Sequence, residues 1–264
     1  MKNLLEVKNL NVEFLLEGKI IRAVKGIDLS IGYNQTRVLA GESGSGKTVM
    51  SLAVTRIIPK NGIITSGEAY LEGVDLLKLD EKQLVKIRGR DIAYIFQEPA
   101  SYLNPVFTIG NQVLEAITLH QNKHGKAAEE EALRLLSLVK IKEPDRVFHS
   151  YPHQLSGGMN QRAFIAMSLA CAPKLLIADE PTTSLDVTIE AEILKLLADL
   201  KSKLGFSLLF ITHNLSIAKK IADRVSVMYD GKIVEEADTK RIFEHPEHFH
   251  TKELIKAYEK IGKI

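Results

Sequence analysis

The sequence predicts an α/β fold built on a largely parallel sheet, and three observations lead to this prediction. Short apolar runs alternate with helical patterns along the chain, as they do where parallel strands are joined by crossover helices. A glycine-rich loop of fixed spacing follows one of these runs, at residues 41–48. A stretch of mostly helical pattern separates two later runs, between residues 97 and 179. The 264 residues are enough for one large domain with a subdomain.

Composition gives the frame for this fold without naming a function. Hydrophobic residues make up 45% and charged residues 26%, as in an ordinary globular protein. The net charge of +2 is too small to argue by itself for a nucleic-acid partner. The single cysteine, Cys171, excludes an internal disulfide and a cysteine-built metal cluster, and its small apolar neighbours predict a buried thiol. No apolar run approaches the roughly 20 residues of a membrane helix, and the start reads directly as a strand, so no signal peptide is expected.

The first element with clear chemistry is the loop that fills every fixed position of G-x-x-x-x-G-K-[ST]. An apolar run at 36–40 precedes it and residues 49–54 can open a helix, which is the strand–loop–helix context that the motif needs. Its glycines let successive N–H groups point at phosphate oxygens, while Lys47 can hold the β- and γ-phosphates and Thr48 can ligate Mg²⁺. This context disfavours a chance glycine-rich turn, so the loop predicts binding of a nucleoside triphosphate. The loop residues are Gly41, Glu42, Ser43, Gly44, Ser45, Gly46, Lys47 and Thr48.

Three further apolar runs end on polar residues. The run 91–96 ends at Gln97, the run 175–178 at Asp179 and Glu180, and the run 206–212 at His213. In open α/β sheets, ligands bind beyond the carboxyl ends of the strands. These strand ends and the glycine-rich loop are therefore expected to converge on one nucleotide.

Each of these polar residues has a predicted role in that site. Asp179 is suited to hold Mg²⁺ directly or through water, and Glu180 could polarise the attacking water as a general base. Gln97 can reach metal or water with its amide, and His213 can bond a γ-phosphate oxygen and orient Glu180. The alternatives are that the Asp-Glu pair caps a helix or turn, and that His213 is structural.

The helical stretch before Asp179 contains a second candidate anion site. An apolar stripe at 126–140 predicts one helix of this stretch. The stretch ends in the segment Leu155-Ser156-Gly157-Gly158-Met159-Asn160-Gln161-Arg162, which precedes the helix-forming residues 163–167. Ser156, Gly157 and Gly158 would present a hydroxyl and bare N–H groups at a helix start. A single chain that binds one nucleotide has no need of two γ-phosphate sites. Two chains arranged head to tail would use both sites. The second site of one chain is then expected to close over the nucleotide of the other.

Taken together, the motifs resemble those of an ABC-transporter ATPase over essentially the whole length. The matches are the Walker A motif at 41–48, the Q-loop Gln97, the signature at 155–162, the Walker B motif at 174–180, the D-loop Ser184-Leu185-Asp186 and the switch His213. The resemblance implies a P-loop NTPase core with a mixed, mainly parallel sheet, an N-terminal antiparallel β subdomain and an inserted helical subdomain. It also aligns Phe14 with the aromatic residue that stacks on adenine, with ordinary strand core as the alternative.

Finer similarity points to the ATP-binding subunits of peptide, nickel and metal-chelate importers. It rests on the extended Q-loop 97–110, on 151–154, on Met159 and on 250–254. This resemblance implies ATP and Mg²⁺ as cofactors and a second ATPase subunit, identical or paralogous, as partner. It further implies two transmembrane permease subunits, an extracytoplasmic solute-binding protein reached through the complex, no nucleic acid, and a peripheral place on the cytoplasmic face of the membrane.

The sequence departs from the subfamily pattern at several positions. Asn34-Gln35 replaces Gly-Glu before the loop strand, although Asn tolerates the left-handed geometry of the turn. Asn160 replaces a commonly basic residue. The chain stops at Ile264 without a cysteine-containing tail, which favours nickel or metallophores over peptides as the transported solute. Three histidines cluster near the end, and they are expected to be ordinary polar side chains on the surface, with metal sensing as the alternative; they are His245, His248 and His250.

The sequence disfavours two other classes of protein. Soluble ABC proteins that act on nucleic acid or ribosomes usually carry tandem cassettes or a long coiled coil, and neither pattern is present. A signalling GTPase is disfavoured because 122–125 lacks the Asp of the guanine-reading motif. An importer ATPase for another small solute stays open. Residues 1–264 are predicted to form one ATP-binding domain, with a nucleotide-binding core at 1–97 and 171–235, a helical subdomain at 98–170 and a C-terminal segment at 236–264.

Overall fold

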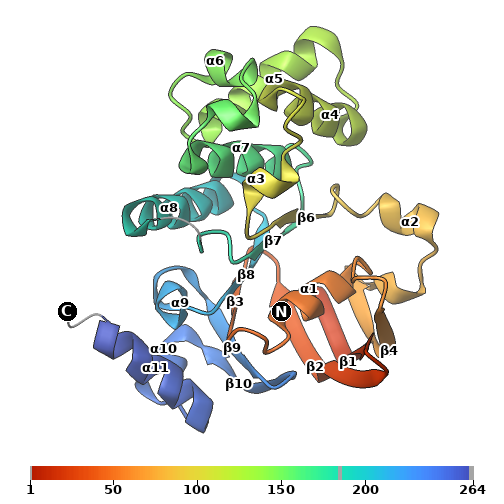
Figure 1. Cartoon of the computed structure of the whole chain (residues 1–264), viewed down its shortest axis with the longest axis vertical. Coiled ribbons are helices and arrows are strands. Elements are labelled where there is room, and N and C mark those ends of the chain that lie inside the picture. Colours follow the sequence, from red (N-terminus) through yellow and green to blue (C-terminus); the bar gives the residue numbers. More distant parts are fainter. Residues whose placement is uncertain (1, 184–185, 262–264) are drawn as a thin grey trace. The chain divides into compact units, whose positions relative to one another are not determined.

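The structure is a computed structural model that describes residues 2–183 and 186–261, and the chain divides into two compact units (Figure 1). The first unit comprises Met1–Leu84 and Ser207–Ile264, and the second comprises Val85–Phe206. These units are defined by which parts of the chain pack together. The functional division proposed from the sequence is a different partition and stays a prediction.

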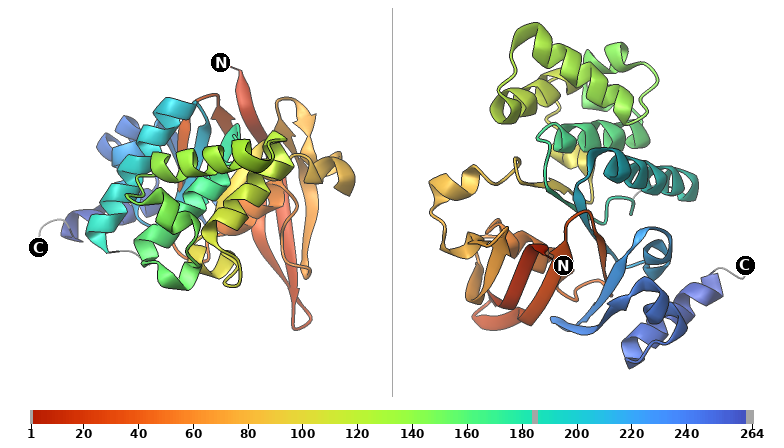
Figure 2. Two further views of the ribbon diagram at one scale, coloured as in Figure 1. Left: turned by 90° about the horizontal axis from the view of Figure 1, so that it is seen from above. Right: turned by 180° about the vertical axis from the view of Figure 1, so that it is seen from behind.

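The N-terminal part of the first unit is an antiparallel sheet. Its strands are β1 (Asn3–Leu16), β2 (Lys19–Gly32), β4 (Gly62–Leu71) and β5 (Val74–Asp75), in the order β2-β1-β4-β5. A two-residue turn joins β1 to β2, and both of its residues, Glu17 and Gly18, have positive φ, as a tight hairpin with right-handed twist requires. The left view of Figure 2 shows this long hairpin in red. The antiparallel β subdomain expected at the N-terminus is confirmed.

The remaining strands of the first unit form a mixed sheet. The buried strand β3 (Thr36–Ala40) pairs in parallel with β8 (Ser207–Thr212) and β9 (Arg224–Tyr229), and β10 (Lys232–Asp238) pairs antiparallel with β9. Every residue of β3 and β8 is buried, as their continuous apolar runs predict. The helices of this unit are α1 (Lys47–Val54), η1 (Leu76–Lys78), α9 (Leu215–Ile221), α10 (Thr239–Glu244) and α11 (Phe249–Ile261), and α2 (Glu81–Val85) lies at its boundary.

The second unit pairs two parallel strands with a group of helices. The strands are β6 (Ile92–Ile95) and β7 (Leu175–Asp179). The helices are α3 (Pro99–Tyr102), α4 (Ile109–Gln121), α5 (Gly125–Leu138), α6 (Pro144–Phe148), η2 (Pro152–Gln154), α7 (Gly157–Leu169) and α8 (Val187–Leu204). The helices α4 to α7 contact one another, and they lie together in both views of Figure 2. The predicted helical subdomain is confirmed.

Helix α5 shows why this stretch folds as a helical cluster. Its buried residues Ala128, Ala132, Leu135 and Leu136 recur at helical spacing and make one apolar face, which packs on α4, α6 and α7. The helix ends two residues earlier than the predicted stripe because Lys140 adopts a left-handed φ of 62°.

Two smaller expectations agree with the structure. Cys171 is buried, and burial raises the pKa of its thiol to about 11, which keeps it in the unreactive protonated form. Asn34 has a left-handed φ of 55°, so it supplies the turn geometry for which a glycine is usual. None of the helices formed by residues 2–183 and 186–261 combines the length and the apolar character that crossing a bilayer requires.

Candidate functional site

The glycine-rich loop occupies the connection between β3 and α1, as the motif predicts. Helix α1 begins at Lys47, inside the motif, and its N-cap Gly46 has a φ of 101°. Gly46 provides no side chain to cap the helix, so the N–H groups of the first turn remain available to an anion. An added Cβ at Gly46 would overlap the Ala23 carbonyl oxygen, and one at Gly41 would overlap the Met228 carbonyl oxygen. Both positions therefore require glycine.

The loop curls around the ammonium group of Lys47. Only 4% of this residue is exposed. Its Nζ donates to the Gly41 carbonyl at 2.9 Å and to the Glu42 carbonyl at 2.8 Å, and it lies 3.4 Å from the Ser45 hydroxyl. Its positive charge is thus fixed at the centre of the loop, while the Thr48 side chain beside it is exposed.

His213 lies at the same sheet edge as the start of this loop. Ala40 pairs with Thr212 in the parallel β3–β8 ladder, so Gly41 and His213 each follow one member of a neighbouring pair. His213 is exposed, and the next residue, Asn214, accepts the Ser216 N–H at 3.0 Å as the N-cap of α9. Within the first unit, the structure therefore brings together the glycine-rich loop and the histidine.

Gln97, Asp179 and Glu180 share an edge of the second unit. Ile95 pairs with Ala178 in the parallel β6–β7 ladder, which brings the ends of the two strands side by side. Gln97 is exposed, whereas Asp179 at the end of β7 is only 5% exposed. A buried carboxylate, an amide and a second carboxylate thus follow two neighbouring strands.

Glu180 has an unusual backbone conformation, with a left-handed φ of 45°. Its carboxylate accepts a hydrogen bond from the Thr183 hydroxyl at 2.9 Å, and its carbonyl accepts the Thr183 N–H at 3.3 Å, which closes a turn. The next helix, α8, is capped by Asp186 and not by the Asp-Glu pair. Of the alternative that the pair caps a helix or turn, the turn agrees with the structure, because Glu180 begins one, whereas α8 has Asp186 as its cap.

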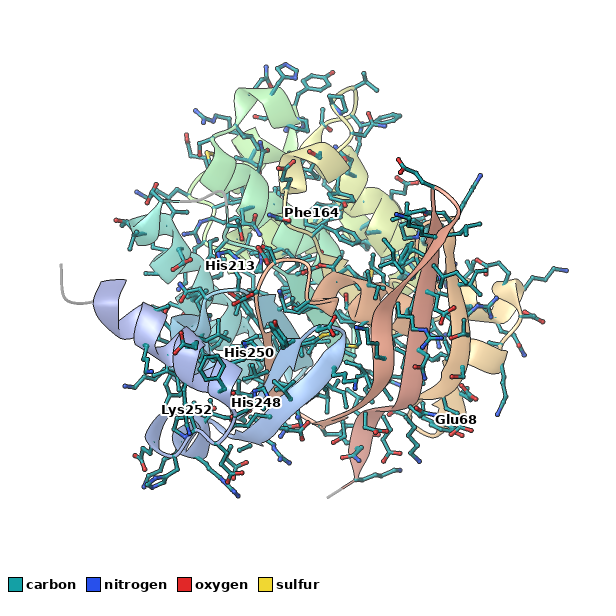
Figure 3. All side chains as sticks on the ribbon, turned by 60° about the horizontal axis from the view of Figure 1, so that its bottom comes forward. Glu68, Phe164, His213, His248, His250 and Lys252 are labelled. Atoms are coloured by element: carbon teal, nitrogen blue, oxygen red, sulfur yellow. The ribbon has the colours of Figure 1, made fainter. Side chains whose placement is uncertain are left out.

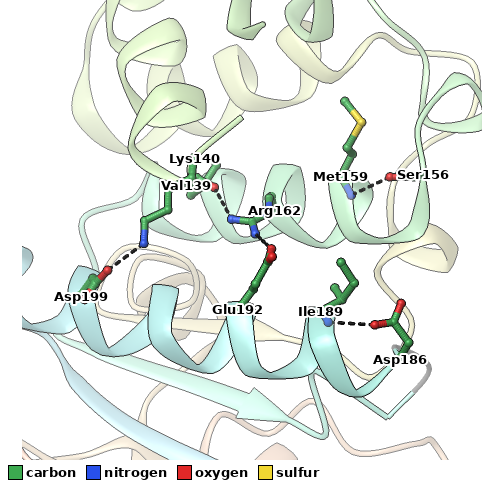
Figure 4. Close-up of polar contacts among 9 residues, drawn as sticks. All are labelled: Val139, Lys140, Ser156, Met159, Arg162, Asp186, Ile189, Glu192 and Asp199. Atoms are coloured by element: carbon green, nitrogen blue, oxygen red, sulfur yellow. Dashed lines mark hydrogen bonds and ion pairs between the residues drawn. The ribbon is translucent and has the colours of Figure 1, made fainter. Parts of the chain in front are cut away.

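The signature residues form the start of α7. Ser156 is its N-cap, and the Ser156 hydroxyl accepts the Met159 N–H at 3.3 Å (Figure 4). Ser156 and Gly157 are exposed, and Leu155, Gly158 and Met159 are half-buried. An added Cβ at Gly158 would lie 3.3 Å from Ile189 Cγ2 on α8, so the two helices approach closely there. The hydroxyl and the bare N–H groups stand at a helix start, as predicted.

The contacts of α7 show what Asn160 does in place of the usual basic residue. They also show a role for Arg162 that the sequence did not indicate. The Asn160 amide is buried and donates to the Pro152 carbonyl at 3.0 Å. Arg162 donates to the Val139 carbonyl at 3.0 Å and to Glu192 of α8 at 2.7 Å (Figure 4). This arginine ties α7 to α8. A basic residue in the signature and an acidic one on the next helix were visible in the sequence, but their pairing was not.

Asp186 is the described part of the predicted D-loop. Its carboxylate accepts the Ile189 N–H at 2.9 Å and caps α8 (Figure 4). Ser184 and Leu185 lie outside the described residues.

The donors assigned to Mg²⁺ have the chemistry that this ion prefers. They are the Thr48 hydroxyl, the Gln97 amide oxygen and the Asp179 carboxylate, all hard oxygen ligands. The histidines near the end of the chain are arranged differently. His248 and His250 stack on each other, and within the described ranges 2–183 and 186–261 no group of three His, Cys, Asp or Glu side chains could hold a metal.

Phe14 lies near the end of β1, opposite Ile21 and Gly62 of the neighbouring strands. Its ring covers Gly62, where an added Cβ would lie 2.7 Å from the ring. Phe14 is half-buried and does not belong to the fully buried core. A partly open aromatic face is compatible with stacking on a base.

A phosphate-binding loop between a buried parallel strand and a helix, together with a second unit that contains a glycine-rich helix start, defines a P-loop ATPase with an inserted helical subdomain. The profile of the ABC transporter family matches residues 24–183. The chain belongs to the ABC transporter family, and it is an ATPase that binds ATP.

Two relatives and one solved structure illustrate the similarity. The chain is 46% identical to "Probable peptide ABC transporter ATP-binding protein y4tR" of Sinorhizobium fredii, over 96% of this chain and 76% of that protein. It is 44% identical to "Glutathione import ATP-binding protein GsiA" of Escherichia coli, over 99% of this chain and 43% of that protein, so it spans less than half of GsiA. A dimeric structure of the ATP-binding cassette MJ0796 bound to ADP and Pi matches with a TM-score of 0.79 and 29% identity, over 89% of this chain and 98% of that one.

Proposed function

We propose that the chain is the ATP-hydrolysing subunit of an importer that takes up peptides or peptide-like solutes through separate membrane subunits. The observation that carries this proposal is the 46% identity, over 96% of the chain, to a relative named for peptide transport. The similarity to a glutathione import protein supports the same class of solute. Nickel and metal chelates, which the end of the sequence favoured, are the alternative solutes.

In this proposal the loop Gly41–Thr48 holds the phosphates of ATP. The buried Lys47 ammonium is bonded to carbonyl and hydroxyl oxygens, and it would exchange these for β- and γ-phosphate oxygens. The uncapped first turn of α1 adds N–H donors and the positive end of the helix dipole. The base would stack on Phe14.

Hydrolysis requires a base for the attacking water. Glu180 takes the proton as the water oxygen attacks the γ-phosphorus, and the bond from that phosphorus to the ADP oxygen breaks. His213 bonds a γ-phosphate oxygen and orients Glu180, and Gln97 reaches the water or the metal. The hydrogen bond from Thr183 to the Glu180 carboxylate supports this assignment, because it fixes the orientation of the base.

Thr48, Gln97 and Asp179 would hold Mg²⁺ in this site. When bound, the ion neutralises charge on the phosphate oxygens as the γ-phosphoryl group is transferred. The side chains of Thr48 and Gln97 are exposed, which leaves their oxygen atoms free to turn toward an ion.

The signature residues Leu155–Met159 would act on a nucleotide held by a second ATPase subunit, identical or paralogous. The exposure of Ser156 and Gly157 supports this assignment, since a phosphate could approach them from outside the chain. Asp186 would lie at the same head-to-tail interface. The complex would also contain two permease subunits and receive solute from an extracytoplasmic binding protein, which places the chain on the cytoplasmic face of the membrane.

Co-expression with the permease subunits tests this proposal. The chain should sediment with membranes only when the permease is present, and its ATP hydrolysis in the purified complex should rise when a solute-loaded binding protein is added. The control is the same experiment with the permease omitted. Sedimentation that instead depends on RNA would overturn the proposal in favour of an ATPase that acts on nucleic acid.

A further inference from the structure

The turn between β9 and β10 lies directly against the phosphate-binding loop. The Gly231 N–H in this turn donates to the Ser45 carbonyl at 3.0 Å. On the strand before the turn, the Met228 carbonyl faces Gly41 so closely that a Cβ there would overlap it. Strand β9 therefore touches the loop at its beginning, and the turn after β9 touches the loop in its middle.

The hydrogen bond from Gly231 orients a peptide group of the loop. In a planar trans peptide, the carbonyl of one residue and the N–H of the next point to opposite sides. Because the Ser45 carbonyl points to the turn, the Gly46 N–H points away from it. The turn thus helps to set the direction of an N–H at the N-cap of α1, where the phosphate is proposed to bind.

The turn itself is fixed on one side by Lys25 of β2. Asp230 and Gly231 both have positive φ, the geometry of a tight Asp-Gly hairpin turn. The Lys25 N–H donates to the Gly231 carbonyl at 2.8 Å, and the Lys25 ammonium bonds the Asp230 carboxylate at 2.6 Å.

On the other side, the turn is held by residues 247–250, which run into the first turn of α11. The ring of Tyr229, the last residue of β9, stacks on the His250 ring with centroids 3.3 Å apart and planes 20° apart. His248 stacks next to His250 at 5.5 Å, and Figure 3 shows these two histidines close together at the start of α11. The aromatic stack therefore reaches from the C-terminal segment to the residue that begins the turn.

Glu235 of β10 fastens the same segment at a second point. One of its carboxylate oxygens accepts the Glu247 N–H and the other accepts the His248 N–H, both at 2.9 Å. Burial alone would raise the pKa of Glu235, but the Thr251 hydroxyl and these two N–H groups favour the carboxylate and lower the pKa below its usual value. The segment is thus attached to both strands of the hairpin.

We infer that Tyr229 and His250 are positioning residues for the phosphate-binding loop, so that the C-terminal segment tunes nucleotide affinity. The path runs from His250 through Tyr229 and the Asp230-Gly231 turn to Ser45. The inference rests on the proposed function of the loop as the ATP site. It gives the C-terminal histidines a role in the nucleotide site without a metal.

The test is the affinity of the full chain for a non-hydrolysable ATP analogue, measured by calorimetry. His250→Ala and Tyr229→Ala should each weaken binding about two- to tenfold, the range expected for a lost aromatic pair. His250→Phe should restore the affinity because it keeps a flat ring. The double variant His250→Ala, Tyr229→Ala should bind no more weakly than either single variant, since both break one contact. His245→Ala is the matched control, because His245 is exposed and ends α10.

The outcomes separate this inference from the proposed function. Absence of analogue binding by the unaltered chain would refute the nucleotide site itself. Normal affinity of His250→Ala, with a lowered Tm, would show that the stack only anchors α11 and would overturn the inference. If His250→Ala unfolds, Tyr229→Leu decides, because it removes the aromatic partner and keeps an apolar side chain; an affinity equal to that of the unaltered chain then counts against the positioning role.

Discussion

Each unit presents a helix start inside a glycine-rich motif, yet the two helix starts satisfy their N–H groups differently. In the first unit, Gly46 leaves the first turn of α1 without a side-chain cap, and the buried Lys47 adds a full positive charge. In the second unit, the Ser156 hydroxyl accepts the Met159 N–H and so caps α7. The basic residue of that motif, Arg162, is turned to Glu192.

This difference indicates which start can bind an anion by itself. The α1 start combines uncapped donors with an ammonium group, which suits a strongly charged phosphate. The α7 start offers an exposed hydroxyl and the partial charge of a helix end, worth typically about 0.3–1 kcal/mol for an anion. The second start is therefore suited to complete a site that another chain has already filled.

Glu180→Gln should have the largest effect, and it sharpens the comparison. The amide keeps the shape of the side chain and loses the base, so ATP hydrolysis should fall about 10²–10⁴-fold while ATP still binds. Because γ-phosphate persists in this variant, the α7 start of one chain should stay closed on the nucleotide of another. Light scattering should show an ATP-dependent dimer. Near-normal turnover by the purified variant would remove Glu180 from this role.

Gly157→Asp alters only the start of α7. An added Cβ at this position meets no atom within 4 Å, so the fold should tolerate the change. The new carboxylate would repel phosphate, and hydrolysis by the reconstituted pair of subunits should fall about 10²–10³-fold, as when donors to a transition state are removed. ATP binding to the first start should be unchanged.

Gly157→Ala is the matched control, because it adds a methyl group without charge and should retain most of the activity. Hydrolysis that survives Gly157→Asp when the signatures of both subunits are altered would refute the shared site.

Lys47→Ala alters the start of α1. It removes the ammonium from the centre of the loop, so ATP affinity should fall about 10- to 100-fold, since hydrogen bonds to charged groups contribute about 1.5–3 kcal/mol. Calorimetry measures this change. Lys19→Ala, at the exposed start of β2, is the control. An unchanged affinity would make the two helix starts equivalent and break the comparison.

The sequence was sufficient for the parts of this site that local chemistry dictates. The loop at 41–48 and the polar ends of β7 and β8 could be predicted because other residue types at these positions would clash with the backbone or lack the required charge. The left-handed Gly46 and the buried runs of β3 and β8 are examples. The helix start at Gly157 was likewise expected from Ser156 and the glycines that follow it.

Contacts between distant segments could not be predicted from one sequence. Lys25 and Asp230 are separated by 205 positions and still form an ion pair. Arg162 and Glu192 are a similar case, with 30 positions between them. Such pairs depend on the three-dimensional path of the chain, and many charged residues along it would have been equally plausible partners.

Phe14→Ala has the expected effect with the lowest lower limit, and it tests whether the binding site at the start of α1 extends to the base. If the ring stacks on adenine, affinity should fall by about 1–3 kcal/mol. Phe14→Leu distinguishes this from a packing role, because leucine still covers Gly62 and has no ring to stack. Weak binding by both variants at unchanged Tm supports stacking. Normal binding by Phe14→Leu, with a lowered Tm for Phe14→Ala, would assign Phe14 to the core of the sheet and confine the first site to the phosphates.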